Sequence, residues 1–144
     1  MHIEQIIRRI AVVCLLVASL SVISMASQKV CLYGYLFTNN IQNFNDFLNN
    51  TTDSPTLFNV SGVLGVLFFL PFLLSSKKLS YCILLCVFYG TQWIVLSVIK
   101  SNSIIKIIIE SVQYCQNYWL LTWAIGHILF IVLSLIFIFY EKRN

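Results

Sequence analysis

The feature that most constrains this chain is an apolar run of 23 residues that extends from Tyr118 to Tyr140. A helix of this length covers about 34 Å, enough to cross a hydrocarbon core about 30 Å thick. Aromatic rings stand at both ends of the run, and Lys142 and Arg143 follow it directly. Amphipathic rings prefer the headgroup region and basic residues stay on the cytoplasmic side, so the run predicts a membrane span that ends in the cytoplasm.

The composition agrees with this interpretation. Of the 144 residues, 59% are hydrophobic and 10% are charged, whereas soluble proteins carry about 25% charged residues. A soluble domain of this size cannot bury so much apolar surface, and lipid must therefore cover part of it. Three further apolar runs, 10–27, 57–74 and 79–99, complete a predicted all-α membrane protein, a single bundle of four transmembrane helices.

The four runs leave two predicted outer loops, 28–56 and 100–117, and a short inner turn, 75–78. Six of the nine basic residues fall on the inner segments and three on the outer ones. This bias predicts that both termini are cytoplasmic. The net charge of +4 thus lies beside membrane ends, and we expect no nucleic-acid partner.

The first apolar run has a second interpretation as a cleaved signal peptide. Arg8 and Arg9 precede a core of apolar residues, and Ser24, Met25 and Ala26 form a small-x-small cleavage site. Cleavage would leave a three-span protein. The sequence supports both an uncleaved anchor and a cleaved signal, and both place the next segment outside.

Two covalent features are expected on the outer side. Of the five cysteines, only Cys31 and Cys115 fall in outer segments, so they are the pair expected to form a disulfide in an oxidising compartment. Asn49 and Asn50 begin overlapping glycosylation sequons in the first outer loop, and an exposed outer loop is where such sequons are used.

Two polar side chains, Gln92 and His127, are expected inside the membrane. They lie about 10 and about 14 Å from the outer ends of their spans, so they can meet at one level. Because a polar group in hydrocarbon needs a partner, we expect a hydrogen bond between them that holds two helices together. The alternative is a proton or ligand site that is also lined by Tyr89, Thr91 and Thr122.

Smaller signals concern helix packing and the second outer loop. Ser61 and Gly65 form a small-xxx-small pair, which lets a neighbouring helix approach closely. The apolar stretch 104–112 is too short to span and carries Lys106 and Glu110 four residues apart. It predicts a helix that lies on the outer membrane surface.

The sequence offers no pattern for chemistry. His2 and His127 are expected in different compartments, and no Cys or His spacing resembles a metal-ligand set. A nucleophile with its base, a Gly-rich phosphate loop and a paired-carboxylate site are also missing from the sequence. We therefore expect no enzyme activity, no metal and no cofactor.

In topology the chain resembles tetraspan families such as the claudins, with termini inside and a longer first outer loop. The claudin-type first loop carries a Gly-Leu-Trp signature and two cysteines, whereas this loop has no Trp and only Cys31. The resemblance therefore implies the topology alone.

We expect a non-enzymatic organising or accessory subunit of the plasma membrane or endomembrane system. Its expected partners are membrane lipid and other integral membrane proteins or further copies of itself. The alternative is a small transporter, channel subunit or lipid-handling protein that works around Gln92 and His127.

Overall fold

The computed structural model describes residues 2–25, 54–97, 104–115 and 118–140, and the structural statements below concern these residues. Within them the chain is helical and contains no strand. Four helices are long and one, α6, is short: α1 (His2–Met25), α4 (Ser54–Leu74), α5 (Lys78–Ser97), α6 (Ile104–Cys115) and α7 (Trp119–Phe139). The predicted all-α class is confirmed for this part of the chain.

Three of the helices are long and apolar enough to cross a membrane, namely Ile3–Ser24 in α1, Lys78–Ser97 and Trp119–Phe139. The prediction of a transmembrane protein is therefore supported. The apolar part of α4, Phe58–Leu74, is shorter than these three. The short α6 covers the stretch in which the sequence predicted a helix too short to span.

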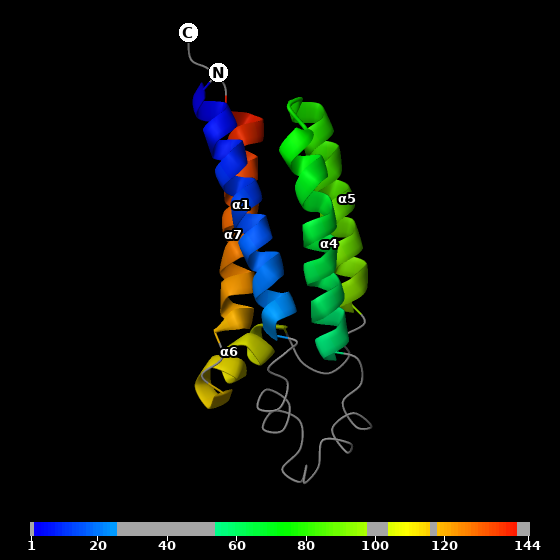
Figure 1. The fold of residues 1–144 in the computed structure, drawn as a ribbon, viewed down its shortest axis with the longest axis vertical. Helices are drawn as coiled ribbons and strands as arrows, with labels where there is room; N and C mark the ends of the chain where they lie inside the picture. The colour runs from blue at the N-terminus through cyan, green and yellow to red at the C-terminus, as the bar shows by residue number, and fades with distance from the viewer. Residues whose placement is uncertain (1, 26–53, 98–103, 116–117, 141–144) are drawn as a thin grey trace.

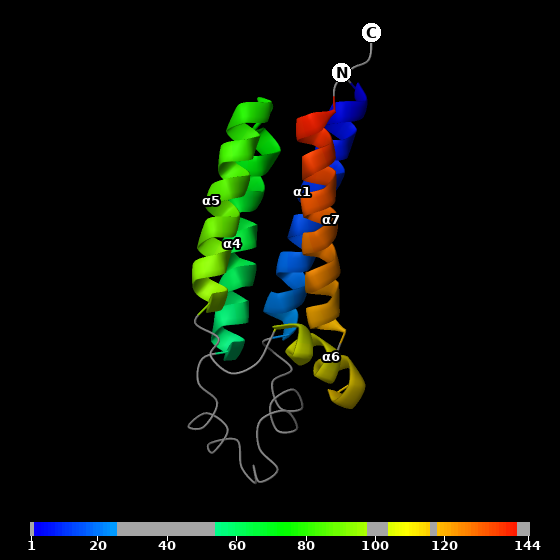
Figure 2. The ribbon, with the colours of Figure 1, turned by 180° about the vertical axis from the view of Figure 1, so that it is seen from behind.

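The long helices lie side by side along the long axis of the molecule, α1 with α7 and α4 with α5 (Figures 1 and 2). The N-terminus, the C-terminal end of α7 and the connection between α4 and α5 lie at one end, which we call the terminal end. The opposite end, where α6 lies against the start of α7, is called the α6 end.

The sequence located the helices well, and the largest difference is at the start of α1. The predicted span begins at residue 10, whereas the helix begins at His2. Ile3, Ile6 and Ile7 extend the apolar pattern toward the N-terminus. Two charged side chains that the prediction left outside the span, Glu4 and Arg8, have partners on other segments, so the first turns of α1 belong to the bundle.

Glycines bring α4 and α7 onto α1. A Cβ at Gly62 of α4 would lie 2.8 Å from the Ser19 carbonyl oxygen, and a Cβ at Gly65 would overlap the Ser19 hydroxyl. On a neighbouring face of α1, a Cβ at Gly126 of α7 would lie 2.7 Å from the Ala18 Cβ. Because glycine has no side chain, the backbones of α4 and α7 approach that of α1 closely, as small residues allow between membrane helices.

The predicted packing role of Gly65 is therefore supported, but its companion is Gly62 and not Ser61. Ser61 is fully buried, and its carbonyl oxygen accepts a hydrogen bond from α5 instead.

Aromatic rings fill the interior on the terminal side of the glycines. Phe72 of α4 lies with its ring centroid 5.1 Å from that of Tyr81 and 5.1 Å from that of Phe130, and both pairs meet edge to face. Phe88 joins the same group, 5.9 Å from Phe72. All four side chains are fully buried. Rings from α4, α5 and α7 thus form one core with the favoured edge-to-face geometry.

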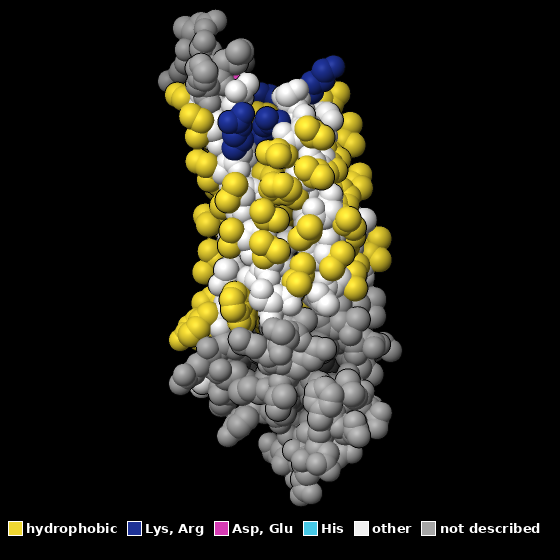
Figure 3. All heavy atoms as spheres, viewed as in Figure 1, with side chains coloured by type: hydrophobic (Ala, Val, Ile, Leu, Met, Phe, Trp, Pro, Cys, Tyr) yellow, Lys and Arg dark blue, Asp and Glu magenta, His cyan; other side chains and the backbone are white. Residues whose placement is uncertain are grey.

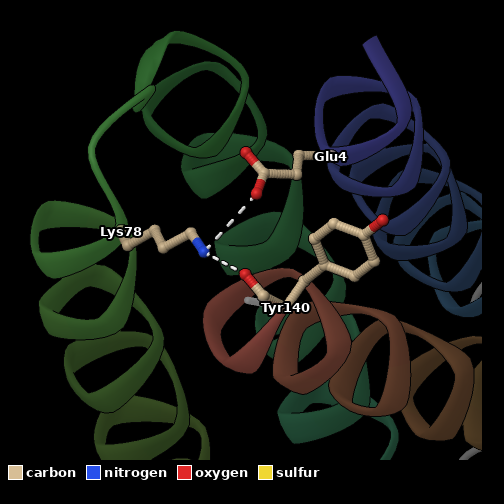
Figure 4. A network of polar contacts seen from close by, with 3 residues as sticks. All are labelled: Glu4, Lys78 and Tyr140. Carbon is tan, nitrogen blue, oxygen red and sulfur yellow. Dashed lines mark hydrogen bonds and ion pairs between the residues drawn. The ribbon is translucent and has the colours of Figure 1, made fainter. Parts of the chain in front are cut away.

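A polar network closes the terminal end (Figure 4). Lys78 Nζ of α5 lies 3.7 Å from Glu4 Oε1 of α1 and donates to the Tyr140 carbonyl oxygen at 2.6 Å. Arg8 of α1 donates to the carbonyl oxygen of Ser75, in the turn after α4. Lys and Arg side chains gather at this end while apolar side chains cover the long sides (Figure 3). The network joins α1, α5, α7 and the α4–α5 turn.

Candidate functional site

Gln92 lies near the α6 end of α5 and is almost completely buried, with 3% of its surface exposed. Its Nε2 donates to the Ser61 carbonyl oxygen of α4 at 2.9 Å. The amide therefore links α5 to α4. Its own carbonyl oxygen, Oε1, is buried and has no hydrogen-bond partner in the described residues.

His127 of α7 is held by aromatic neighbours from two helices. The Tyr89 hydroxyl of α5 lies 3.2 Å from His127 Nδ1. The Phe88 ring stacks parallel to the imidazole at 6.0 Å, and Trp123, one turn away on α7, meets it at 5.0 Å between ring centroids. These contacts fix the ring and occupy Nδ1, whereas Nε2 is buried and has no partner within the described part of the chain.

The structure does not join Gln92 to His127. Gln92 bonds to Ser61 and His127 to Tyr89, and each keeps an unpartnered atom. The reason is a difference in level. His127 stacks on Phe88, and Gln92 follows Phe88 by four residues, which places it about 6 Å farther along α5. The prediction of a direct hydrogen bond between them was wrong, although both side chains are buried as expected.

The other residues proposed to line this region divide into two groups. Tyr89 contacts His127 as expected. The Thr91 hydroxyl donates to the Phe88 carbonyl oxygen at 2.7 Å, and the Thr122 hydroxyl donates to the Tyr118 carbonyl oxygen at 2.9 Å. Both threonines thus satisfy their hydroxyls within their own helices, as is common for Thr in helices.

Sequence reasoning missed two members of the polar region. Ser61 Oγ and Trp123 Nε1 are buried without a partner, as are Gln92 Oε1 and His127 Nε2. Trp123 was read as an aromatic belt residue because it lies near the end of an apolar run. Its position one turn before His127 is the signal that would have placed its ring beside the imidazole.

Two unpartnered buried atoms lie elsewhere. Ser75 Oγ is in the turn at the terminal end, and Asn59 Oδ1 lies on a face of α4 about 160° away from Ser61. The candidate site therefore consists of Ser61, Gln92, Trp123 and His127.

The predicted covalent sites lie outside what the structure describes. Cys31, Asn49 and Asn50 fall in the range 26–53, and Cys115 is the last residue of α6, where its side chain is not described. The described cysteines, Cys14, Cys82 and Cys86, are free thiols. Neither the disulfide nor the glycosylation prediction is tested.

Chemically, the candidate site offers hydrogen-bond donors and acceptors without charge. The five charged side chains that the structure describes are Glu4, Arg8, Arg9, Lys77 and Lys78, all toward the terminal end. Within the described residues no three His, Cys, Asp or Glu side chains come together as metal ligands would. The arrangement is suited to holding a neutral polar group.

Comparison with models of known families, with curated proteins and with solved structures gives no match.

Proposed function

We propose that the chain is a four-span integral membrane protein that acts as a non-enzymatic organising or accessory subunit and binds other membrane proteins through its helix faces. The observation that carries this proposal is the outward face of α5. Helix α1 packs against three of the described glycines, Gly62, Gly65 and Gly126. At Gly90 of α5, by contrast, no atom lies within 4 Å of the position that a Cβ would take.

The surroundings of Gly90 form a continuous apolar face. Leu79, Ile83, Val87 and Ile94 repeat at helical spacing on the same side of α5 and are between 49% and 76% exposed. Small residues at membrane helix surfaces let a second backbone approach. In this chain, every other described glycine serves that purpose within the molecule. By the same principle, the Gly90 face is where a helix of another protein, or of a second copy of the chain, packs closely on α5.

The test is affinity purification from mild detergent with identification of the proteins that co-purify, carried out on the unmodified chain and on Gly90→Leu. A leucine at this position blocks close approach without contacting the rest of the bundle. We expect a stoichiometric partner, or a homo-oligomer, that is lost in Gly90→Leu. The matched control is Val132→Leu on the exposed side of α7, where the side chain is 47% exposed, and this variant should retain the partner. Equal recovery with both variants would refute the proposal.

The four-span topology is part of the same proposal, with both termini in the cytoplasm. It is supported by the position of the N-terminus and the end of α7 beside the α4–α5 turn (Figure 1) and by the basic residues gathered there (Figure 3). The packing of Gly62 and Gly65 of α4 against Ser19 of α1 supports α4 as the proposed fourth span. Accessibility of single cysteines placed at residues 76 and 142, measured from each side of the membrane, tests this orientation.

We extend the proposal to the outer segments and the location. The outer segments carry a disulfide between Cys31 and Cys115 and a glycan at Asn49 or Asn50. The protein resides in the plasma membrane or endomembrane system. The support is the sequence and the proposed topology. The intact mass before and after deglycosylation and reduction decides both modifications, and an unmodified mass would contradict them.

A second candidate function is a small transporter, channel subunit or lipid-handling protein that works around Gln92 and His127. The four unpartnered polar atoms of the candidate site favour it, because natural proteins seldom bury polar groups without a hydrogen-bond partner. Co-purification of a lipid or another small molecule with a chain that has no protein partner would favour this candidate over the first.

A further inference from the structure

The candidate site contains four polar atoms that the protein itself does not satisfy. Ser61, Gln92, Trp123 and His127 are 0%, 3%, 7% and 8% exposed, so each is at least nine-tenths buried. Ser61 Oγ, Gln92 Oε1, Trp123 Nε1 and His127 Nε2 have no hydrogen-bond partner among the residues that the structure describes. Natural proteins seldom bury a polar group without a partner, and four in one region of a small bundle need a common explanation.

These four residues lie in one region of the bundle, which we call the layer, and within it His127 lies about 6 Å nearer the terminal end than Gln92. The hydrogen bond from Gln92 to the Ser61 carbonyl oxygen sets α5 and α4 at the same level. The Phe58 ring, one turn before Ser61, meets Trp123 at 5.5 Å between centroids, and this contact sets α4 and α7 at the same level. Trp123 and His127 are neighbours on α7. The layer therefore draws one or two polar atoms from each of three helices.

The donors and acceptors in this layer specify what binds there. The Trp123 indole can only donate a hydrogen bond and the Gln92 carbonyl can only accept one, whereas a serine hydroxyl can do both. His127 Nε2 donates or accepts according to its tautomer. A hydroxyl group carries one donor and two acceptor lone pairs, and it can accept from Trp123 while it donates to Gln92. One hydroxyl makes at most three hydrogen bonds, so it can accept from Trp123 and from Ser61 and donate to Gln92.

Charged ligands fit the layer poorly. The charged side chains that the structure describes lie toward the terminal end, so none of them offsets the cost of moving an ion from water into this layer. The aromatic neighbours Phe58, Phe88 and Tyr89 supply apolar surface around the polar atoms. A neutral molecule with a hydroxyl group can satisfy three of the polar atoms and place apolar surface against the rings.

We propose that Ser61, Gln92 and Trp123 form a binding site for the hydroxyl group of a neutral molecule, with His127 beside it. Two sources present this chemistry, a water molecule and the alcohol group of a membrane lipid such as a sterol. The inference rests on the second candidate function, which it makes specific. It is independent of the Gly90 face, whose partner is measured by co-purification.

The first experiment is photolabelling of the purified full chain in phosphatidylcholine nanodiscs. The probes are a diazirine-bearing cholesterol with a free hydroxyl and its methyl ether, which keeps the acceptor and loses the donor. For a lipid alcohol, we expect saturable labelling that is about tenfold weaker with the ether, as fits the loss of one hydrogen bond. Gln92→Leu and Trp123→Phe should reduce labelling by the alcohol to the level of the ether.

The matched control is Thr91→Val. Thr91 adjoins Gln92, but its hydroxyl bonds to its own helix, and this variant should label like the unmodified chain. Circular dichroism of each variant confirms that it is folded, and Trp123→Phe preserves an aromatic ring at the position. If Gln92→Leu is misfolded, Trp123→Phe still tests the site.

A second measurement identifies water as the source. In a Trp93→Phe, Trp119→Phe background, Trp123 is the remaining tryptophan, and its emission is compared in light and heavy water. An isotope effect without saturable labelling, reduced by Gln92→Leu and not by Thr91→Val, assigns the hydroxyl to water. The proposal is overturned if Gln92→Leu and Thr91→Val behave alike in both measurements, or if alcohol and ether label equally and the isotope effect is missing. Failure of the second candidate function alone would leave these signals intact, since neither depends on transport.

Discussion

Gly126 packs directly against Ala18, since a Cβ at Gly126 would come to 2.7 Å from the Ala18 Cβ and 3.1 Å from the Cys14 carbonyl oxygen. The backbones of α1 and α7 therefore approach each other closely at this point, where an added Cβ would not fit. On a neighbouring face of α1, Ser19 fills the space left by Gly62 and Gly65. Helices α4 and α7 thus both pack closely against α1.

The first prediction compares Gly126→Ala with Gly90→Ala. Both variants gain helix propensity, but only the first meets neighbouring atoms. Because overpacking costs about 1–3 kcal/mol, we expect Gly126→Ala to be less stable than Gly90→Ala by about that difference. Unfolding in mixed micelles, followed by circular dichroism, measures both free energies. Equal stabilities would contradict the close contact of α1 with α7.

The second prediction is that residues 1–26 remain in the mature protein. Loss of α1 would remove the Ser19 and Ala18 surfaces against which Gly62, Gly65 and Gly126 pack. Peptide mapping of the protein purified from eukaryotic membranes should recover peptides from α1. An N-terminus at Ser27 would show that the segment is a cleaved signal and that the three remaining long helices pack in another way.

The positions of the helices could be predicted from the sequence because each apolar run must be helical to satisfy its backbone in lipid. Hydropathy and length located α5 and α7 within two residues at each end. The start of α1 was missed because Glu4 and Arg8 look like solvent-exposed residues until their partners at the terminal end are known.

The contacts between helices could not be predicted in the same way. An apolar side chain facing lipid and one facing another helix look alike in sequence, so nothing distinguished Ser61 from Gly62 as the companion of Gly65. The partner of Gln92 was missed for a related reason. A membrane amide needs a hydrogen bond, but a backbone carbonyl such as that of Ser61 satisfies it as well as another polar side chain does.

The third prediction concerns Arg8 and Arg9, which are adjacent and carry the same charge. Arg8 is 9% exposed and donates to the Ser75 carbonyl oxygen, whereas Arg9 is exposed. Hydrogen bonds from charged groups contribute about 1.5–3 kcal/mol, so Arg8→Met should lower the free energy of unfolding by about that amount. Arg9→Met should change it by less than about 0.5 kcal/mol. Since both variants lose one basic residue, a similar loss in each would mean that charge at the membrane end, and not the Ser75 contact, provides the stability.

The fourth prediction concerns the hydrogen bond between Tyr81 and Ser134, which joins α5 to α7 through two buried hydroxyls at 2.9 Å. Hydrogen bonds between membrane helices contribute on average about 0.6 kcal/mol and at most about 1.7 kcal/mol. A double-mutant cycle with Tyr81→Phe and Ser134→Ala should therefore give a coupling energy in this range.

The control cycle pairs Tyr81→Phe with Thr122→Val, whose hydroxyl bonds within its own helix, and it should be additive within about 0.5 kcal/mol. If the Tyr81 and Ser134 cycle is equally additive, the two hydroxyls do not hold α5 to α7. The ring contact of Tyr81 with Phe137 of α7, at 5.1 Å, would then be what joins these helices, because Tyr81→Phe leaves the ring in place.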